Sequence, residues 1–361
     1  MIGWKRFHEG SELTTIARVA QAAGVGVGTV SRVLNGSSSV SEATRRRVLE
    51  VIAELGYEPN AAARALSTGR TRTFGVLAPF FTQPSVVERL RGVSRVVADA
   101  GYHLVLFDVE HADPFGELTA VGRLDGLLCV SLRPPDSALE RFDAARVPVV
   151  LVDAEHPRLA GVSIDDVEGG RIAAEHLLGL GHRRIAFIGD DEQGTPFGFD
   201  SSARRRIGAA AALRAAGVEL IVRRGPHGRE HARALAAGLL ASPEAPTAIF
   251  AASDSQALGV LEAAETAGVS VPGDLSVIGF DDIEVARYVG LTTVAQPLEE
   301  SGVRGARLLL EALEGSARSA QRLKLRLVAR ATTADPYHAA RTTRVARRPR
   351  TGDIVGHIHP V

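Results

Sequence analysis

The stretch AGVGVGTVSRVLNG, residues 23–36, combines a glycine-containing turn with a short amphipathic segment. The turn at 24–25 precedes a segment in which Val30 and Val33 recur at helical spacing and face one side. Asn-Gly at 35–36 is typical of the end of a helix. We therefore expect a short helix that follows directly on a tight turn.

The residues on either side extend this pattern to three helices. Thr15 can cap an earlier helix, and Ser41 can cap the later segment EATRRRVLEVIAEL, which Gly56 ends. Two helices joined by a tight turn and braced by a third are typical of a helix-turn-helix unit. The apolar faces that would hold the unit together consist of Ile16, Val19, Ala20 and Ala23 in the first helix, and Val48, Val51, Ile52 and Leu55 in the third.

A short alanine-rich segment, YEPNAAARALSTGRT (57–71), follows this unit. Pro59 breaks the chain, and NAAARALS has the composition of a helix. Isolated helices shorter than ~12–15 residues are only marginally stable in water. We therefore expect this segment to become helical only on contact with a partner.

From Phe74 the chain alternates between apolar strands and amphipathic helical segments. Continuous apolar strands in this setting indicate a parallel sheet covered by helices on both faces. The segment 74–336 is too long for one modest sheet, so the sequence predicts two doubly wound lobes. A cleft between them, at the carboxyl ends of the strands, is where such sheets bind ligands. The expected strands are FGVLA, HLVLFD, GLLCVS, VPVVLVD, RIAFIG, TAIFAAS and LSVIGFD.

The charges of the 361 residues sum to zero but are unevenly distributed. Residues 1–70 carry nine Lys and Arg against six Glu, and residues 337–361 carry five Arg against one Asp, so the segment between them is acidic. Basic ends on an acidic body suit a chain that meets phosphate at one end.

The single cysteine, Cys129, lies in an apolar run and is expected to be a buried core thiol. A chain with one cysteine cannot form an internal disulfide, which suits a reducing compartment. No stretch approaches the ~20 apolar residues that span a bilayer. The first residues also lack the apolar segment of a signal peptide. We expect a cytoplasmic protein with no membrane partner.

Six motifs, in order and in register, make the chain resemble the LacI/GalR family of bacterial transcription regulators. They are TVSRVLNG, VSEATRRRV, LGYEPN, ARALSTGRTRTFGV, LGHRRIAFIG and DLSVIGFDD, and the resemblance runs from about Thr15 to Pro336. It implies a protein that binds a palindromic operator in double-stranded DNA as a homodimer or a dimer of dimers. It further implies a transcription regulator, expected here to be a repressor, controlled by a small-molecule effector such as a sugar or a related metabolite.

The resemblance gives the fold class as a small all-α helix-turn-helix headpiece and hinge helix, followed by an α/β core of two doubly wound parallel-sheet lobes. This core is like that of the periplasmic binding proteins. The expected parts are an N-terminal extension (1–14), the headpiece (15–58), the hinge helix and linker (59–72), the effector-binding and dimerisation core (73–336), and an Arg-rich tail (337–361) that we expect to be disordered.

The resemblance also implies which residues contact DNA. In the family the second helix enters the major groove, and the hinge inserts a leucine into the minor groove at the operator centre. Leu66 matches that leucine, although a residue that packs the hinge on the core is the alternative interpretation. The remaining assigned residues are Thr15, Thr29, Ser31, Arg32 and Asn35 in the headpiece, and Asn60, Ala63 and Arg64 around the hinge.

Val27 and Gly28 align with the main base-reading pair of the family, where hydrogen-bonding side chains are common. Valine can only contact a thymine methyl group or exclude a base, and glycine has no side chain, so direct readout should be weak here. Either the operator is read mainly through its shape and the hinge, or the headpiece is degenerate. We favour the first alternative because the rest of the headpiece is intact.

The effector residues follow from the resemblance position by position. Gln83 stands where many members carry Asn before Pro and an aromatic residue; that aromatic is missing, and Phe81 is among the nearby rings that can replace it. Arg205 matches the arginine that forks onto ligand hydroxyls or a carboxylate. Ser253, Asp254 and Asp281 fall at strand ends, where helix capping is the alternative interpretation, and Gln296 is a further candidate.

Two other classes of protein share the expected core. A sugar-binding protein of the transport class would carry a secretory signal in place of the headpiece. An enzyme would show a glycine-rich phosphate loop at the first strand, His/Cys metal spacing or a Ser-His-Asp set, and none is evident. We therefore expect no enzymatic activity, no cofactor and no metal. The expected mechanism is a shift in lobe closure, on effector binding, that changes operator affinity.

Overall fold

The computed structural model describes residues 15–57, 70–79, 81–109, 115, 124–191, 198–316 and 320–336. The chain divides into two units, Met1–Thr71 and Arg72–Val361, which we describe separately. Several sequence-based predictions lie outside the described residues. These are the N-terminal extension, the hinge residues Asn60, Ala63, Arg64 and Leu66, and the Arg-rich tail.

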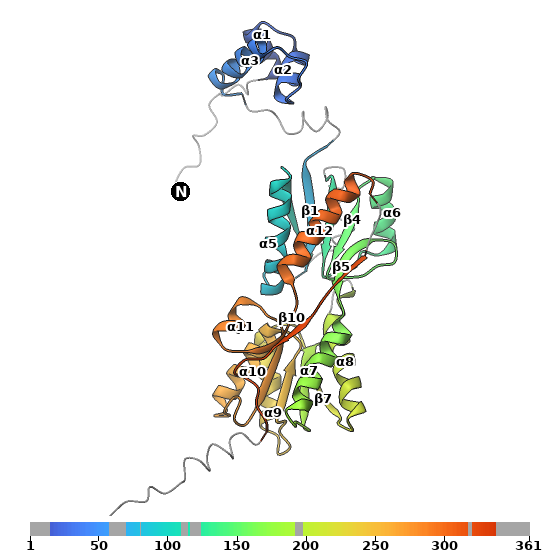
Figure 1. Ribbon diagram of the computed structural model, residues 1–361, viewed down its shortest axis with the longest axis vertical. Helices are drawn as coiled ribbons and strands as arrows, with labels where there is room; N and C mark the ends of the chain where they lie inside the picture. Colours follow the sequence, from blue (N-terminus) through green and yellow to red (C-terminus); the bar gives the residue numbers. More distant parts are fainter. Residues whose placement is uncertain are drawn as a thin grey trace, which may run out of the picture. The chain divides into compact units, whose positions relative to one another are not determined.

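The described part of the first unit is a three-helix headpiece (Figure 1), with α1 at Ile16–Ala23, α2 at Val27–Leu34 and α3 at Glu42–Glu54. The Thr15 hydroxyl accepts from the Arg18 amide and the Ser41 hydroxyl from the Thr44 amide, both at 3.4 Å, so both predicted caps form. Gly24 ends α1 in the left-handed region, at φ 63°. The apolar core of this unit consists of Val19, Ala20, Ala23, Val30, Val33, Val40, Val48 and Tyr57.

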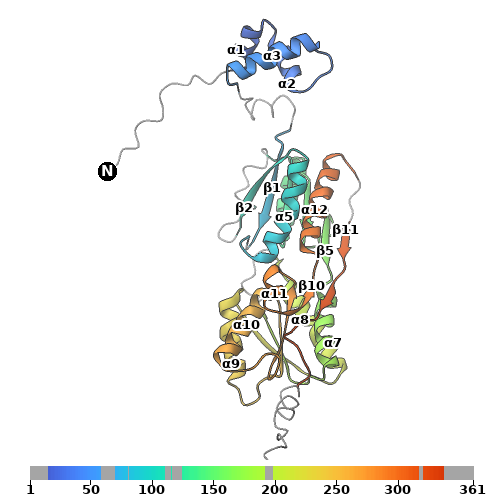
Figure 2. The ribbon, with the colours of Figure 1, turned by 60° about the vertical axis from the view of Figure 1, so that its left-hand side comes forward.

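The second unit contains two six-stranded sheets, one in each of two lobes (Figures 1 and 2). The first lobe has the strand order β11-β5-β4-β3-β1-β2. Its strands are β1 (Thr73–Ala78), β2 (His103–Asp108), β3 (Gly126–Val130), β4 (Val149–Val152), β5 (Ala160–Ile164) and β11 (Ala320–Leu323), all of which pair in parallel. Its helices are α5 (Pro84–Asp99), α6 (Asp136–Ala144) and α12 (Leu298–Leu313).

The second lobe has the strand order β12-β10-β9-β8-β6-β7. Its strands are β6 (Ile185–Asp190), β7 (Leu220–Gly225), β8 (Ala248–Ala251), β9 (Ser276–Asp281), β10 (Thr292–Ala295) and β12 (Arg326–Val328), of which only β12 pairs antiparallel. Its helices are α7 (Asp166–Gly179), α8 (Ser201–Ala215), α9 (Arg229–Leu240), α10 (Asp254–Thr266) and α11 (Glu284–Tyr288).

Helices cover both faces of each sheet, because successive strand residues point to opposite sides. In β3, Leu128 belongs to the apolar cluster that includes α5 and α12, whereas Leu127 and the buried Cys129 belong to the cluster that includes α6. In β6, Phe187 packs toward α7 and α8, and Ile188 packs with residues of α9 and α10. The predicted fold class, two doubly wound lobes behind a helical headpiece, is confirmed.

The chain crosses between the two lobes three times. It crosses from β5 to α7, from β10 to α12, and from β11 to β12. Since α7 and α12 each begin immediately after a crossover, any rotation of one lobe against the other acts first on these two helices. The three crossovers therefore form the hinge of the core.

Reciprocal glycine contacts hold one helix pair tightly together in each lobe (Figures 1 and 2). A Cβ atom on Gly302 of α12 would lie 2.0 Å from the Arg89 carbonyl of α5, and one on Gly170 of α7 would lie 1.8 Å from the Arg205 carbonyl of α8. Gly92 and Gly208 make the reverse contacts. Each hinge-connected helix is thus packed directly against a helix that carries a buried arginine.

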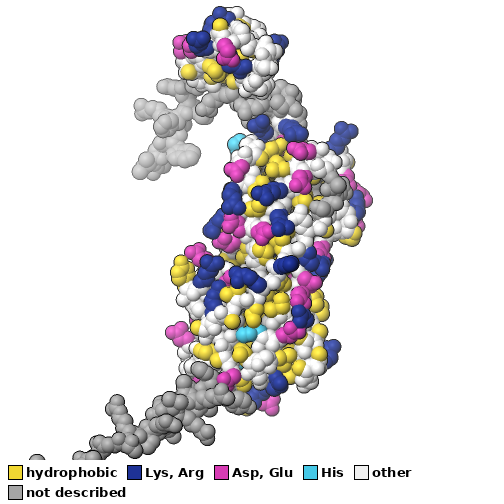
Figure 3. Space-filling model, viewed as in Figure 1, with side chains coloured by type: hydrophobic (Ala, Val, Ile, Leu, Met, Phe, Trp, Pro, Cys, Tyr) yellow, Lys and Arg dark blue, Asp and Glu magenta, His cyan; other side chains and the backbone are white. Residues whose placement is uncertain are grey.

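The surface of the core shows no segregation of charge on the face in view. Acidic and basic side chains are interspersed there (Figure 3). Within the described residues, no helix is long and apolar enough to cross a membrane, and no group of His, Cys, Asp and Glu could hold a metal ion.

Candidate functional site

A polar cleft lies between the two lobes, at the carboxyl ends of their strands. In this structure the cleft encloses a cavity of about 40 Å³. Ligand pockets usually have volumes of about 300–1,000 Å³, so the cleft is narrow in this structure. The lining residues are Pro79, Gln83, Ser85, Val86, Arg89, Ser131 and Asp153 of the first lobe, Asp190, Phe199, Ser202, Arg205, His227, Ala252, Ser253 and Asp281 of the second, and Gln296.

Three of the lining residues occupy unusual backbone conformations where strands end. Ser131 after β3, Asp153 after β4 and Asp281 at the end of β9 have φ angles of 55°, 62° and 119°. Residues other than glycine adopt such angles at a cost of order 1–3 kcal/mol, and they cluster at functional sites. The strand ends therefore hold polar side chains toward the cleft at the expense of stability.

Arg89 of α5 is the central cation of the first lobe. Arg89 as a whole is only 1% exposed. The guanidinium donates to Asp153 Oδ1 at 2.7 Å, to Gln296 Oε1 at 2.8 Å and to the Ser85 carbonyl at 3.2 Å. Its Nε has no partner within the described residues. Because a buried N–H group without a partner is costly, this atom is a candidate donor to a ligand.

Arg205 of α8 is the corresponding cation of the second lobe. Its Nε donates to Asp166 Oδ1 at 2.8 Å and its Nη1 donates to the Ala252 carbonyl at 2.7 Å. Asp281 lies 3.8 Å from the same Nη1, and the guanidinium carbon lies 3.6 Å from the centre of the Phe280 ring. These contacts fix the guanidinium plane, as cation–π stacking does at buried sites.

Gln296, in the crossover from β10 to α12, connects the two arginine clusters. Its Oε1 accepts from Arg89, and its Nε2 donates to Asp281 Oδ1 at 2.6 Å. A continuous chain of buried polar contacts therefore runs from one lobe to the other. In order, it comprises Asp153, Arg89, Gln296, Asp281, Arg205 and Asp166.

Asp190 forms a separate cluster at the end of β6. Its Oδ1 lies 3.0 Å from His227 Nδ1 and accepts from Gln256 Nε2 at 2.9 Å. Burial opposes protonation of His227, but the hydrogen bond and the charge of Asp190 raise the pKa of the imidazole above its ordinary value. This histidine is therefore poised to balance the charge of Asp190.

Burial also dominates the ionisation of the carboxylates beside Arg205. It raises the pKa of Asp166 to about 6, against the opposing charge of Arg205 and with a further rise from Asp153. It raises the pKa of Asp281 as well, although Arg205 and Arg89 lower it. The acidic groups of the cleft are thus incompletely compensated by its two arginines.

Five of the seven residues assigned to the effector from the sequence line this cavity, namely Gln83, Arg205, Ser253, Asp281 and Gln296. Phe81 does not line it and instead packs against the main apolar cluster. Asp254 does not line it either. Its carboxylate accepts from Thr293 Oγ1 at 2.6 Å and from the Ile283 amide at 2.9 Å, which holds the loop after β9 in place.

Several cleft residues were missed from the sequence. Asp153 and Asp190 end apolar strands, so the rule that selected Asp281 could have found them. Ser253 lines the cavity and also caps α10 through the Gln256 amide, so the capping interpretation is confirmed and effector contact stays a prediction. Arg89 gave no signal, because it sits in a helix rich in charged residues and nothing local distinguishes it from an exposed arginine.

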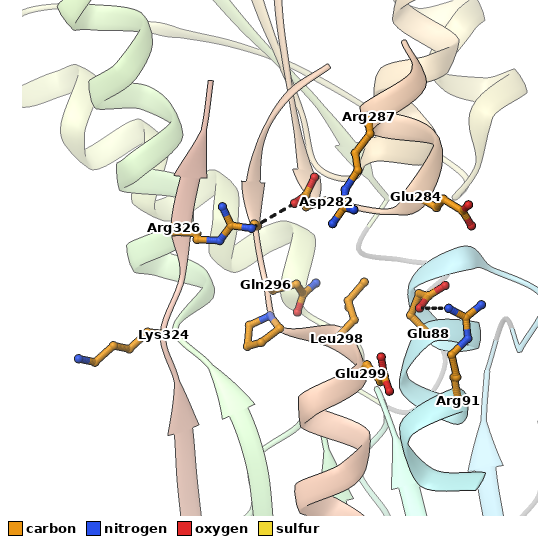
Figure 4. A pocket seen from close by; sticks show the side chains of 12 residues that line it. Glu88, Arg91, Asp282, Glu284, Arg287, Gln296, Leu298, Glu299, Lys324 and Arg326 are labelled. Atoms are coloured by element: carbon orange, nitrogen blue, oxygen red, sulfur yellow. Dashed lines mark hydrogen bonds and ion pairs between the residues drawn. The ribbon is translucent and has the colours of Figure 1, made fainter. Parts of the chain in front are cut away.

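A second, more open hollow of about 510 Å³ is lined by residues of both lobes (Figure 4). Gln296 lines both this hollow and the cleft. The other lining residues come from α5, α11, the start of α12 and the β11–β12 crossover, and they include Arg91, Arg326, Glu284 and Glu299. Five of the twelve lining residues, Arg91, Glu284, Arg287, Lys324 and Arg326, are exposed, whereas the cleft is lined mainly by buried and half-buried residues.

The headpiece residues assigned to DNA lie on or near its surface. Thr15, Arg32 and Asn35 are exposed, and Val27 has an exposed fraction of 46%. Thr29 and Ser31 are half-buried, and Ser31 accepts from the Asn35 side chain at 3.4 Å. Thr15 already caps α1. Exposure makes contact with DNA feasible at the exposed positions, whereas Thr15 and Ser31 also have structural roles.

Gly28 leaves space that Arg32 partly uses. A Cβ atom on Gly28 would meet only the Arg32 guanidinium, at 3.8 Å. Arg32 lies four residues later on the same helix face, so it can extend back along α2 toward the helix start. Its guanidinium therefore lies beside the position whose own side chain is missing.

Comparison with known sequences identifies both units. Residues 15–60 match the bacterial regulatory proteins of the lacI family, and residues 174–333 match the periplasmic binding protein-like domain. The chain is 34% identical over 331 residues to the HTH-type transcriptional regulator DegA of Bacillus subtilis (strain 168), covering 86% of this chain and 95% of DegA. The chain belongs to the LacI family.

Two solved structures agree with this LacI-family assignment. A transcriptional regulator CelR–cellobiose complex is 33% identical, with 88% of this chain and 99% of that chain covered and a TM-score of 0.65. A lac repressor dimer bound to operator and the anti-inducer ONPF is 29% identical, with 89% and 99% covered and a TM-score of 0.78. This chain is accordingly a LacI-family transcriptional regulator with a DNA-binding headpiece, and its relatives are regulators rather than enzymes.

Proposed function

We propose that the chain is a repressor that binds a palindromic operator as a homodimer and responds to a small-molecule effector in the inter-lobe cleft. The headpiece (15–58) reads each half-site, and the hinge segment (59–72) becomes helical on DNA. The core (73–336) dimerises and binds the effector. The operator-bound dimer of the similar lac repressor supports the assembly.

The observation that carries this proposal is the buried polar chain across the core. It runs from Asp153 through Arg89, Gln296, Asp281 and Arg205 to Asp166, and it includes a residue of the hinge itself. A ligand that bonds to Arg89, Gln296 or Asp281 competes with the contacts that join the two lobes. Effector binding therefore changes the preferred closure of the lobes. Through the hinge segment (59–72), this closure changes the affinity for operator.

The polarity of the cleft supports a hydroxyl-rich effector, a sugar or a related metabolite. Carboxylates that accept and guanidinium groups that donate alternate along its wall, as ligand hydroxyls require. The similar CelR structure holds cellobiose, a sugar.

Operator recognition is divided between α2 and the hinge segment (59–72) in this proposal. Arg32 supplies the base contact that Val27 and Gly28 cannot make, since an arginine can bond to a guanine with two hydrogen bonds. Leu66 wedges into the minor groove at the operator centre and favours an easily kinked base step.

The test is selection of binding sites from random double-stranded DNA by the purified protein, followed by sequencing. We expect a palindrome with a sharply defined centre and looser flanks. The selected site then serves as the probe for an effector screen. A ligand that releases the protein from DNA acts as an inducer, and one that tightens the complex acts as a corepressor. Failure to select any site, with and without pooled metabolites, would contradict the proposal.

A further inference from the structure

We propose that the effector is a polyhydroxylated ring that carries a protonated amine, which is the chemistry of an amino sugar. The amine lies against Asp190 of the second lobe, and the ring or hydroxyl oxygens accept from Arg89 of the first. This inference rests on the proposed function, because it names the ligand class of the same cleft.

The distribution of charge in the cleft is the first observation. Arg89 lies 2.7 Å from Asp153, and Arg205 lies 2.8 Å from Asp166 and 3.8 Å from Asp281. Two guanidinium groups thus serve three carboxylates. Asp190 is the fourth, and no Arg or Lys within the described part of the chain lies within ion-pair distance of it.

Asp190 is nevertheless buried, with a side-chain exposed fraction of 7%. Within the described residues, its Oδ1 receives the neutral amide of Gln256 and the ring of His227, which is its one potential cationic partner there. A buried carboxylate beside a neutral imidazole is unfavourable, so the group must be compensated by protonation of His227 or by a cation that arrives from outside. A ligand ammonium at this position supplies the missing charge, and an anionic ligand would add to the surplus.

The unpaired Nε of Arg89 is the second, independent observation. The Arg89 side chain has an exposed fraction of 2%, and the other guanidinium nitrogens already donate to protein oxygens. The buried Nε lacks an acceptor within the described residues, although the side chain lines the cavity. A ligand hydroxyl or ring oxygen would satisfy it. The ligand therefore presents oxygen to the first lobe and positive charge to the second.

The walls of the cleft favour a hydroxylated ring over a flat aromatic base. Phe199 is the aromatic side chain among the described lining residues, whereas the Phe280 ring is already covered by the Arg205 guanidinium. One ring offers an apolar face to one side of a sugar but cannot sandwich a base. The remaining wall is made largely of groups that bond to hydroxyls.

The experiment uses the full-length protein and matched ligand pairs at pH 7, measured by titration calorimetry. Each pair shares one ring: glucosamine with glucose, galactosamine with galactose, and mannosamine with mannose. The N-acetylated form of each amine removes the charge, and the corresponding uronate reverses it. We expect at least one amine to bind about tenfold or more tightly than its hexose and its N-acetyl form, since hydrogen bonds between charged groups are the strong ones.

Two protein variants test whether Asp190 is the source of the tighter binding of the amine. Asp190→Asn keeps the shape and the acceptor oxygen, and it should reduce the advantage of the amine over the hexose to about threefold or less. Glu284→Gln, an exposed residue of the same lobe that does not line the cleft, removes the same charge and should leave the advantage intact. The comparison of amine with N-acetyl form on the unaltered protein does not depend on how either variant folds.

The inference would be overturned if no amine of the panel bound more tightly than its matched hexose, N-acetyl form and uronate, or if the cleft bound none of the panel. Operator binding by the same preparation is measured in parallel. A protein that selects an operator but ignores amines retains the proposed function and loses only this inference. Loss of both operator and ligand binding contradicts the proposed function itself.

Discussion

Arg32 is the exposed cation of the second headpiece helix, and its guanidinium lies beside the empty position of Gly28. A helix whose first turn carries valine and glycine has few direct means of telling one base pair from another. If α2 lies in the major groove, as the proposed function has it, Arg32 can supply a base contact from one turn later in the helix. Its effect on recognition can be separated from its general attraction for phosphate.

Arg32→Ala should weaken binding to the selected operator by about 1–3 kcal/mol and relax the sequence preference at one position of each half-site. Binding is measured by fluorescence titration at fixed salt, because phosphate contacts depend on ionic strength. Arg214→Ala removes the same charge from an exposed site on α8 of the core and should have little effect. Equal losses for the selected site and for random DNA would show that Arg32 contacts only phosphate.

Asp166 gives the cleft a pH dependence whose sign follows from its pKa. Burial raises the pKa of this carboxyl from 3.8 to about 6, so the folded state keeps its proton where the unfolded state has lost it. The associated stability is complete below pH 4 and declines as the pH rises through 6. Asp166→Asn cannot ionise, so it avoids this loss.

We therefore expect the difference in unfolding free energy, variant minus wild type, to increase as the pH rises from 4 to 6, by at most about 3 kcal/mol. Urea denaturation of both proteins at several pH values measures it. Taking the difference removes the contribution of other carboxylates. A difference that stays constant over this range would contradict the assigned cause.

The cleft residues could be predicted in two ways: Gln83, Arg205 and Gln296 came from the family resemblance, and others from the ends of apolar strands. Polar residues after apolar strands gave Ser253 and Asp281, and the same rule applies to Asp153 and Asp190, which it should have included. Arg89 could not be found this way. Its burial depends on Gly302 of a helix more than 200 residues away in sequence, and no local pattern encodes that contact.

At the scale of the elements, the reciprocal glycine contacts determine how closely the paired helices approach. A Cβ atom at position 302 would lie 2.0 Å from the Arg89 carbonyl, so α12 would have to move away from α5. Steric insertion of this kind usually costs about 1–3 kcal/mol and sometimes more. The helix that would lose this close contact, α5, is the one that carries Arg89 into the cleft.

Gly302→Ala should therefore lower the melting temperature of the protein and weaken effector binding together. Gly238→Ala is the matched control, since Gly238 lies within α9 and a Cβ atom there meets nothing within 4 Å. Alanine should stabilise that helix by about 0.5–1 kcal/mol. Thermal unfolding and calorimetric titration measure both variants. A stable Gly302→Ala protein with unchanged affinity would show that the helix contact is not limiting.

The hinge segment lies outside the described residues, and its role is predicted from the sequence alone. If the hinge makes the main contribution to recognition, Leu66→Ala should weaken operator binding far more than Val27→Ala. A wedge that unstacks a base step is worth more than the contact of one exposed valine methyl group. Parallel titrations with one operator compare them, and equal losses would contradict a recognition mode dominated by the hinge.

The predicted strands correspond to β1, β2, β3, β4, β6, β8 and β9, whereas β5, β7, β10, β11 and β12 were missed. β5 and β10 lie inside their sheets but mix apolar residues with Gly, Ser and Thr, which leaves no continuous apolar run. The other missed strands lie at sheet edges. β7 carries Arg223 and Arg224 at a sheet edge, so its residues are partly exposed and its pattern is mixed. β11 and β12 are short crossover strands of four and three residues. Such segments take their conformation from the strand beside them more than from their own composition.

At the scale of the whole molecule, none of the apolar clusters formed by the described residues contains residues of both units. The headpiece cluster contains residues up to Tyr57, and the other clusters begin at Phe74. Each unit therefore has a core of its own, as an independently folding domain requires. Residues 72–336 should fold without the headpiece.

This fragment should unfold cooperatively and bind the effector with the affinity of the full chain, but it should not bind operator. Calorimetry measures the first two properties, and titration with the selected DNA measures the third. A fragment that aggregates, or that unfolds without a cooperative transition, would show that the core depends on residues before Arg72.

Position 28 also bears on how such a regulator can change its targets. A side chain introduced at Gly28 would project from the helix surface into open space, with the flexible Arg32 guanidinium as its sole neighbour within 4 Å among the described residues. If α2 reads the major groove as the family resemblance implies, single substitutions at position 28 would add a base preference without disturbing the headpiece core. The open space there would then let related regulators diverge in operator preference one mutation at a time.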